Sequence, residues 1–344
     1  MAVTPGDKEI TIYDIAKVLG VSIATVSRAL KDNPAVSKST RKKILQTAKK
    51  MGYRPNNFAS NLRTQKTHTI GIIIHELNSN FIISVLTGVE MVTAEAGYDL
   101  IIAHSSETAK KEVANVHNLF HKRVDGLIAS LAYDTEDLSH FDPFIKKGTP
   151  VVYFDRVDDN AVGLKVVIDN VKAGFIATEH LIRQGCRDIV HITASLKRNV
   201  YADRLMGYRQ ALLDNGLPYR EDRVMVDDLS REAAIAAAQR ILKMQPRPDG
   251  VFVTNDFCAS VCMQKLKEEG VRIPEDIAVV GFNNDVICQI VEPRLTTIDY
   301  PGREIGEVAA RHLIGLLKGN SNNNSTNTVI LKSQLVVRAS SQPR

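Results

Sequence analysis

The chain changes character at Thr69, and the pattern beyond that residue sets the narrowest limits on the fold. Short β-branched apolar runs alternate there with amphipathic helical patterns such as ADRLMGYRQALLDNG and REAAIAAAQRILKM. The runs are TIGIII (69–74), YDLIIA (98–103), DGLIAS (125–130), TPVVYF (149–154), RDIVHITA (187–194), DGVFVT (249–254) and EDIAVVGF (275–282). Continuous apolar strands that alternate with helices indicate parallel sheets covered by helices on both faces. The predicted fold class is therefore α/β.

Seven such strand–helix units are more than one compact sheet holds comfortably, and the pattern divides in two. We predict two doubly wound parallel-sheet subdomains, about 69–167 and about 168–297. A helix and an Asn-rich loop, 298–327, are assigned to the first subdomain, and the strand VILKSQLVV within 328–340 to the second. Open α/β sheets bind ligands at the carboxyl ends of their strands, so a ligand cleft is expected between the two subdomains.

The N-terminal segment Ile10–Arg28 predicts a helix–turn–helix. Thr11 and Asp14 form a capping box that begins the first helix. Gly20 suits the sharp turn because glycine accepts a positive φ. Ser22 can cap the second helix. Ala16, Gly20 and Val26 are small, turning and packing residues at the offsets that a tight two-helix unit requires.

Helical spacing also predicts the core of this head. The first helix presents Ile12, Ile15, Ala16 and Leu19 on one face. The apolar side of the second helix is Ile23 or Val26, together with Leu30. A third helix begins near Ser37 and runs to residue 51, with Ile44, Leu45, Ala48 and Met51 facing inward and a Lys/Arg stripe outside.

The charge of the chain is concentrated in this head. Residues 1–62 hold eleven Lys and Arg against four Asp and Glu, or +7, whereas the remainder of the chain is −2. The outer face of the second helix carries Ser22, Thr25, Ser27 and Arg28, which suit phosphates and base edges. An ordinary αα-hairpin on a globular surface is the alternative, but the basic head favours contact with nucleic acid.

A polar linker follows Pro55, which breaks the third helix. Its sequence has enough helix propensity for one or two turns, too few to be stable alone in water. We expect it to fold on DNA. The predicted domains are thus a helix–turn–helix domain (1–54), a hinge or linker (55–68) and an effector-binding and dimerisation body (69–344).

Other classes of protein receive no support from the sequence. No apolar run approaches the roughly 20 residues that span a bilayer, and the N-terminus lacks the apolar core of a signal peptide. The four cysteines show no zinc-ligand spacing, and Cys258 and Cys262 are expected to be buried thiols. His117 and His121 are expected on a solvated helix face. We find no catalytic motif, so we expect no enzyme, no metal, no cofactor and a cytoplasmic, nucleoid-associated bacterial protein.

Several ordered motifs resemble those of the LacI/GalR family of bacterial transcription regulators. The head matches I-T-I-Y-D-I-A-x-x-x-G-V-S-x-x-T-V-S-R, and the linker matches P-N-x-x-A-x-x-L. Further matches are R-L-M-G-Y (204–208), V-T-N-D (253–256), I-P-E-D-I-A-V-V-G-F (273–282), L-T-T-I (295–298) and L-V-V-R-A-S-S (335–341). The resemblance covers nearly the whole chain and implies a periplasmic-binding-protein-like body, with a hinge helix between head and body.

The resemblance implies a homodimer whose paired heads bind a near-palindromic operator in double-stranded DNA. A tetramer is a further possibility in the family, but the apolar heptad tail that it uses is not found here, which favours a dimer. Ile23 and Ala24 fall at positions that select bases, and Leu62 at one that wedges into the minor groove. The residues implied to contact DNA are Thr11, Tyr13, Ser22, Ile23, Ala24, Thr25, Ser27, Arg28, Ser37, Tyr53, Asn56, Ala59 and Leu62. Packing within the head is the alternative role for Ile23, and packing on the body is the alternative for Leu62.

The resemblance also implies a small effector, a sugar or sugar derivative, in the cleft. Leu229 stands where many members have an aromatic residue, and Asn283 where many have Asp. Asp155 is as well explained as a surface turn residue, and Arg204 has a structural salt bridge as its alternative role. The implied effector residues are Asn80, Phe81, Asp155, Arg204, Leu229, Asn255, Asp256 and Asn283.

Two other functions share parts of this pattern. A sugar-binding transport protein would have the same two-subdomain body, but it requires an export signal and lacks a DNA-binding head. An enzyme with a regulatory head would need phosphate-cradling or acid–base motifs, and none is found. We therefore expect a transcriptional regulator that acts as a repressor, with an effector that is either an inducer or a corepressor.

Overall fold

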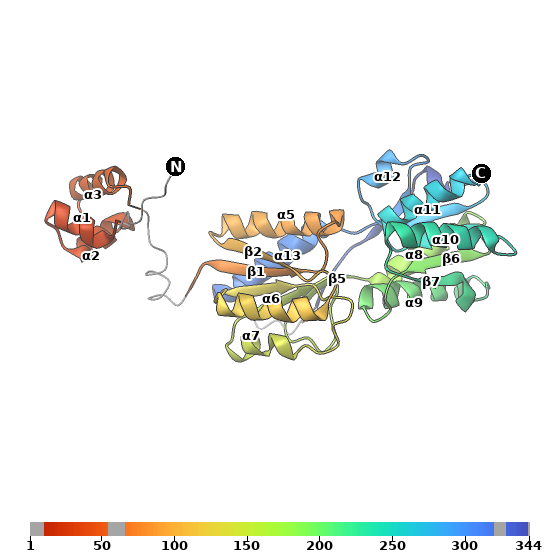
Figure 1. The fold of residues 1–344 in the computed structure, drawn as a ribbon, viewed down its shortest axis with the longest axis horizontal. Helices are drawn as coiled ribbons and strands as arrows, with labels where there is room; N and C mark the ends of the chain where they lie inside the picture. The colour runs from red at the N-terminus through yellow and green to blue at the C-terminus, as the bar shows by residue number, and fades with distance from the viewer. Residues whose placement is uncertain (1–9, 54–65, 320–327, 343–344) are drawn as a thin grey trace, which may run out of the picture. The chain divides into compact units, whose positions relative to one another are not determined.

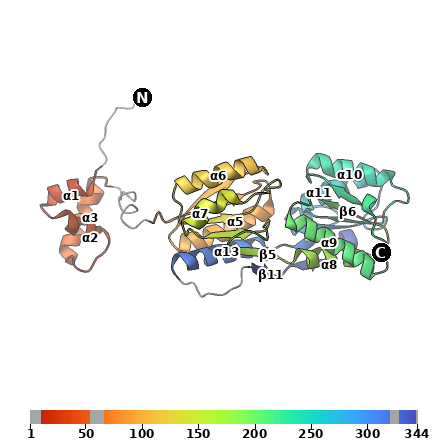
Figure 2. The ribbon, with the colours of Figure 1, turned by 90° about the horizontal axis from the view of Figure 1, so that it is seen from below.

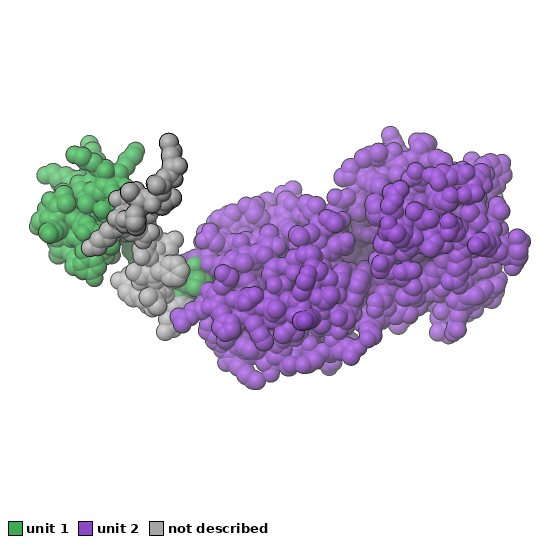
Figure 3. Space-filling view, in the orientation of Figure 1, with its two compact units in different colours: residues 1–67 green, residues 68–344 purple. Residues whose placement is uncertain are grey.

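The computed structural model describes residues 10–53, 66–319 and 328–342. The chain forms two compact units, residues 1–67 and residues 68–344 (Figure 3). We call them the head and the body and describe each by itself.

The described residues of the head, 10–53, form a three-helix unit, and its helix ends are those that the sequence predicts. It contains α1 (Ile12–Leu19), α2 (Ile23–Leu30) and α3 (Lys38–Lys50). Asp14 accepts hydrogen bonds from the backbone N–H and the hydroxyl of Thr11, at 2.8 and 2.7 Å. Ser22 accepts from the Thr25 N–H, and Gly20 ends α1 with φ +62°. The predicted capping box, second cap and turn glycine are therefore confirmed.

The core of the head corrects one prediction and decides another. Val26 is fully buried whereas Ile23 is 40% exposed, so Val26 is the core residue of α2. We predicted Leu45 to face inward, but it is 41% exposed. Ile44 and Ala48, four residues apart, share the buried face, and Leu45 lies about 100° further round the helix. The buried apolar residues of the head are Ile15, Ala16, Val26, Ala29, Ile44 and Ala48.

The first subdomain of the body is built on a six-stranded parallel sheet with strand order β11-β5-β4-β3-β1-β2. The strands are β1 (Thr69–Ile74), β2 (Asp99–His104), β3 (Gly126–Ala129), β4 (Val151–Phe154), β5 (Leu164–Ile168) and β11 (Thr328–Leu331). Its helices are α5 (Asn80–Glu95), α6 (Ala109–His121), η1 (Ser139–Phe141), α7 (Asp142–Lys146) and α13 (Gly302–Leu317). Figure 2 shows α6 on the far side of the sheet from α13, so both faces are covered.

The second subdomain repeats this plan, with strand order β12-β10-β9-β8-β6-β7. Its strands are β6 (Ile189–Thr193), β7 (Val224–Val226), β8 (Gly250–Val253), β9 (Ala278–Asn283), β10 (Thr296–Asp299) and β12 (Gln334–Val336), the last antiparallel to β10. Its helices are α8 (Asn170–Arg183), α9 (Asn199–Asp214), η2 (Glu221–Arg223), α10 (Arg231–Lys243), α11 (Asp256–Glu268), α12 (Ile287–Ile290) and η3 (Ala339–Ser341). The predicted α/β fold of two parallel-sheet subdomains is confirmed (Figure 1).

The chain crosses between the subdomains three times, and the third crossing differs from our prediction. The crossings follow β5, β10 and β11. We predicted one strand, VILKSQLVV, and placed 328–340 in the second subdomain. Instead β11 pairs with β5 in the first sheet, and β12 pairs with β10 in the second. The polar residues 332 and 333 between them separate two strands that belong to different sheets, which an apolar pattern alone does not reveal.

One helix pair in each subdomain is packed through facing glycines. A Cβ added at Gly88 or Gly306 would lie 2.1 Å from a backbone oxygen of the partner helix, in the α5–α13 pair. In the α8–α9 pair, a Cβ at Gly207 would lie 2.0 Å from the Val171 oxygen. The backbones therefore touch at both crossings. A continuous apolar cluster extends over these four helices and both sheets, so the two subdomains share one core region.

Candidate functional site

The outer face of the head carries most of the residues that were predicted to contact DNA. On α2, Ser22, Ile23, Ala24 and Arg28 are exposed, and Thr25 and Ser27 are partly exposed. Tyr13 on α1 is 64% exposed. Because the exposed side chain of Ile23 is not needed in the core, it is free to contact another molecule. The face combines hydroxyls, a cation and small apolar groups, which suits phosphates and thymine methyl groups.

The remaining predicted DNA contacts have structural roles in the head or lie beyond it. Ser37 accepts a hydrogen bond from the Thr40 N–H at 3.2 Å and so caps α3. Tyr53 packs against the head core, and Thr11 begins α1. The three predicted linker contacts, Asn56, Ala59 and Leu62, lie outside the described residues.

Arg204, a predicted effector residue, is buried and bonded within the second subdomain. It lies on α9, is 3% exposed, and its guanidinium carbon lies 3.6 Å from the centroid of the Phe282 ring. Its Nε donates to Asn170 Oδ1 at 2.9 Å, and Nη1 donates to the Thr254 carbonyl at 3.3 Å. Burial lowers the pKa of Arg204. A buried cation of this kind stabilises acceptor groups that are brought close to it.

Asp155 and Phe81 meet at Tyr300, which lies at the crossing after β10. The Tyr300 hydroxyl donates to Asp155 Oδ1 at 2.8 Å, and the Phe81 and Tyr300 rings stack with centroids 4.2 Å apart. Burial raises the pKa of Asp155, and the neighbouring Arg156 opposes that rise. Asp155 is therefore a buried group and not a surface turn residue.

Asn255 and Asp256 are engaged in the structure of the second subdomain. Asn255 accepts from the Cys258 N–H at 2.9 Å and so caps α11. Asp256 is fully buried and accepts from the Thr297 hydroxyl at 2.7 Å and the Asp285 N–H at 2.9 Å. Both residues thus hold the loops at the carboxyl ends of the strands in place.

Three of the predicted effector residues have left-handed backbone conformations. The φ angles are +58° at Asp155, +60° at Leu229 and +117° at Asn283. Each such conformation costs on the order of 1–3 kcal/mol in a non-glycine residue and is common at ligand sites. Asn80 and Asn283 line the same hollow, whereas Leu229, in the loop that follows β7, is buried.

A second group of residues, which no sequence motif indicated, joins the subdomains. Arg156 donates to Glu107 at 2.6 Å and to the Tyr201 hydroxyl at 3.0 Å. Its guanidinium carbon lies 4.2 Å from the centroid of the Tyr133 ring, and the Tyr133 and Tyr201 hydroxyls are 3.2 Å apart. Tyr201 is on α9, and the other three residues follow β2, β3 and β4. Their positions after apolar strands were the available signal.

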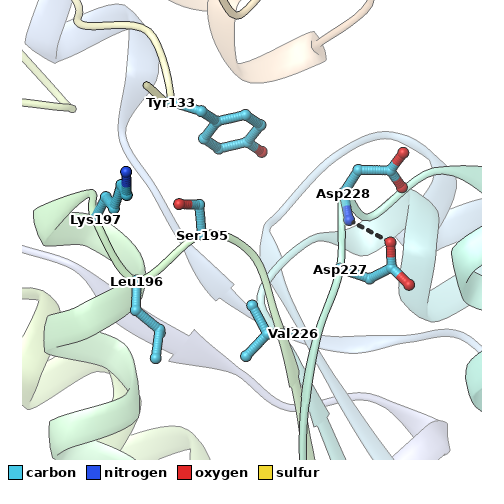
Figure 4. Close-up of a pocket in the computed structure, with 7 residues that line it drawn as sticks. All are labelled: Tyr133, Ser195, Leu196, Lys197, Val226, Asp227 and Asp228. Atoms are coloured by element: carbon cyan, nitrogen blue, oxygen red, sulfur yellow. Dashed lines mark hydrogen bonds between the residues drawn. The ribbon is translucent and has the colours of Figure 1, made fainter. Parts of the chain in front are cut away.

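Two hollows lie at the junction of the subdomains. The larger, about 770 Å³, is lined by Tyr133, Ser195, Leu196, Lys197, Val226, Asp227 and Asp228 (Figure 4). The other, about 440 Å³, includes Asn80, Phe81, Asn283, Asp285 and Tyr300. Burial, together with the charge of Asp256, raises the pKa of Asp285 to about 7. Both hollows therefore present carboxyl groups to a ligand.

One cluster in the described part of the body has donor atoms close enough to hold a metal ion. Ligand atoms of His75, Glu76 and Glu107 lie within 4.8 Å of one another. Glu107 is already paired with Arg156, and His75 Nδ1 lies 3.0 Å from the Ser130 hydroxyl. Because the guanidinium neutralises Glu107 and repels a cation, we assign no metal to this cluster.

Two family models match the chain. Residues 11–56 match "Bacterial regulatory proteins, lacI family", and residues 178–341 match "Periplasmic binding protein-like domain". Catabolite control protein A of Priestia megaterium is 33% identical over 305 residues, which cover 88% of this chain and 91% of the relative. The chain belongs to the LacI family. It is a DNA-binding transcriptional regulator, as the sequence motifs predicted.

Solved structures show the same fold over nearly the whole chain. The lac repressor dimer bound to operator and the anti-inducer ONPF superposes with a TM-score of 0.87 at 24% identity, covering 97% of this chain and 99% of that one. The complex of the transcriptional regulator CelR with cellobiose gives 0.72 at 29% identity, covering 96% and 100%. None of the described helices is long and apolar enough to cross a membrane.

Proposed function

We propose that this regulator is a repressor that binds a near-palindromic operator as a homodimer. A small ligand in the cleft of the body, a sugar or sugar derivative, controls its affinity for DNA. Because the proposed target is chromosomal DNA, we place the protein in the bacterial cytoplasm, on the nucleoid.

The exposed face of α2 supports the operator contacts. Arg28 can pair with phosphates, and Ser22 can share its hydroxyl between its cap and the DNA backbone. Ile23 and Ala24 offer no hydrogen bonds to bases, so they would select thymine methyl groups and local shape. In this proposal Leu62 supplies further selectivity by wedging into a deformable central step of the operator.

Exposed apolar side chains support a dimer through one side of the body. Ile83 on α5 and Ile102 on the edge strand β2 are about half exposed, and Phe257 on α11 and Ile290 on α12 are also exposed. In Figure 1 the helices α5, α11 and α12 lie along the same side of the body. Exposed apolar side chains are costly in water when they gather on one side of a protein, and such a side is typical of a surface that pairs with a second copy.

One observation carries the proposal of ligand control: residues from both subdomains meet in one buried network. Phe81 and Asp155 of the first subdomain contact Tyr300 at a crossing, and Arg204 of the second lies 5.5 Å from the Tyr300 ring. A ligand beside this network would change the relative angle of the subdomains. If the linkers fold only at one spacing, ligand and operator affinities are coupled reciprocally. The cellobiose complex of CelR makes a saccharide a reasonable first ligand.

The proposal is tested by selecting an operator from a pool of random DNA duplexes with the full-length protein. We expect a selected site with two-fold symmetry and two protein chains for each duplex in sedimentation. Saccharides added to the gel-shift titration should then change the affinity at least fivefold. Selected sites without symmetry, or one chain for each duplex, would contradict the proposal.

A further inference from the structure

The centre of the cleft is filled by the protein itself. Arg204, Asp155 and Arg156 are each less than 5% exposed, and Tyr300 is 4% exposed. All four have hydrogen-bonded or stacked neighbours within the protein. A ring-sized ligand does not fit among them without displacing these contacts. The room that remains is in the hollows, and the larger lies against Tyr133.

This larger hollow is placed so that one ligand would contact both subdomains. One side of the hollow is formed by residues 195–197, which follow β6, and by residues 226–228 at the end of β7. This side is therefore made by the carboxyl ends of two parallel strands. Open α/β sheets bind ligands at that edge. Tyr133 follows β3 of the first subdomain and forms the opposite wall (Figure 4). Binding here therefore bridges the two subdomains.

Tyr133 is held in a fixed position before any ligand binds. Arg156 lies over one face of its ring, and its hydroxyl is 3.2 Å from that of Tyr201. Arg156 is itself fixed by Glu107 at 2.6 Å. The ring is therefore a preorganised surface on which a ligand ring can stack at little entropic cost. It provides the aromatic surface that the buried Leu229 does not.

The charges around the hollow disfavour an anionic ligand. The Asp227 and Asp228 carboxylates are exposed at its wall, and they accept hydrogen bonds but cannot donate them. One oxygen of each already accepts a backbone N–H at 2.8 Å, from Asp228 and Ser230 respectively, so the second oxygen of each is left for a ligand. The ammonium group of Lys197 is 2.5 Å from Glu136 and is already paired. A phosphate or carboxylate would meet two like charges at this wall, and Glu136 already offsets the charge of the one lysine in its lining. Hydroxyl groups, in contrast, would donate to the carboxylates.

We propose that Tyr133 and Asp227 select the effector: the Tyr133 ring stacks on it and Asp227 accepts its hydroxyl groups. The effector is then an unphosphorylated, polyhydroxylated ring compound. This inference rests on the proposed function, because it names the ligand class and the contact residues of the same cleft.

The ligand class is tested by isothermal titration calorimetry of the full-length protein with matched pairs. The pairs are glucose and glucose 6-phosphate, ribose and ribose 5-phosphate, and cellobiose and its 6′-phosphate. We expect binding only among the unphosphorylated members. A phosphorylated member that binds as tightly as its partner, or no binding by any pair, would overturn the inference.

The contact residues are tested with the saccharide that binds best. Tyr133→Ala should weaken binding about tenfold, the equivalent of one stacking contact, whereas Tyr133→Phe should stay within threefold. Equal binding by Tyr133→Ala and the wild type, or a tenfold loss in Tyr133→Phe, refutes the role of the ring.

Asp227→Asn should weaken the same saccharide at least tenfold, because a charged acceptor is lost. The matched control is Asp214→Asn, which neutralises an exposed carboxylate at the end of α9 outside the hollow. Gel shifts with the selected operator are run on every variant. If the wild-type protein does not bind the operator, the proposed function is refuted. If it binds the operator but its effector is phosphorylated, only this inference is refuted.

Discussion

His191 makes the stability of the second subdomain depend on pH. It lies in β6, and none of its side chain is exposed. Its ring lies 5.0 Å from Tyr208 and 4.7 Å from Phe252, measured between centroids. Burial lowers the pKa of His191 to about 3, and the charge of Arg204 acts in the same direction. The folded protein therefore keeps this imidazole neutral.

The size of the effect follows from the difference between the folded and unfolded pKa values. In the unfolded chain a histidine has a pKa of about 6.5. Below that pH the unfolded chain binds a proton that the folded chain does not, so the free energy of unfolding falls. The stability is fully present above pH 6.5 and is lost as the pH falls toward 3. Between pH 8 and pH 5 this one group removes about 2 kcal/mol.

The test is His191→Phe, which keeps an aromatic ring between the same two neighbours and removes the titrating group. Guanidinium unfolding is followed by far-UV circular dichroism at pH 8 and pH 5, because the chain has no tryptophan. From pH 8 to pH 5, the free energy of unfolding of the variant should fall by about 2 kcal/mol less than that of the wild type. His117→Phe on the exposed face of α6 shows what removing a histidine does by itself. The same pH dependence in His191→Phe and wild type would refute the reasoning.

Three further changes test the packing, the cleft and the linker. Gly207→Ala places a Cβ 2.0 Å from the Val171 oxygen and should lower the free energy of unfolding by about 3 kcal/mol, whereas Gly315→Ala, with nothing within 4 Å, should not destabilise α13. Arg204→Met keeps the stem over Phe282 but removes the charge; we expect it to abolish the ligand response in gel shifts while operator affinity stays within threefold. Leu62→Ala should lower affinity for the selected operator at least tenfold, with saccharide affinity in calorimetry unchanged; equal operator affinity would exclude the wedge.

The head could be predicted almost completely because its structure is local. The bonds between Thr11 and Asp14, and from Thr25 to Ser22, join residues three apart, and side-chain type alone specifies them. The prediction that Leu45 faces inward was wrong because it depended on more than local structure. Helical spacing defines an apolar face to within about one residue, and only the position of the neighbouring helices decides which side is buried.

The body could be predicted at the level of strands and helices but not of their partners. The runs of β-branched residues showed where strands occur, and the repeat showed that there are two sheets. Nothing in VILKSQLVV showed that its two halves pair in different sheets. The same limit applies to the junction, because Arg156 contacts Tyr201 from 45 positions away. Pairings over such distances depend on how the elements pack and leave no local periodic signal.

Buried residues and loop residues have different roles within the cleft. Residues implied by the family resemblance, such as Arg204 and Asp155, are buried: Arg204 lies over the Phe282 ring, and Asp155 accepts a hydrogen bond from Tyr300 at a crossing. A change at these positions alters how the subdomains are joined, and so it affects the ligand response whatever the ligand is. Tyr133 and Asp227 lie on loops at the hollow, where a change alters which ligand fits without breaking the junction. Regulators of this fold can therefore retain the buried network and exchange the loop residues, which explains why motif residues identify the family but not the effector.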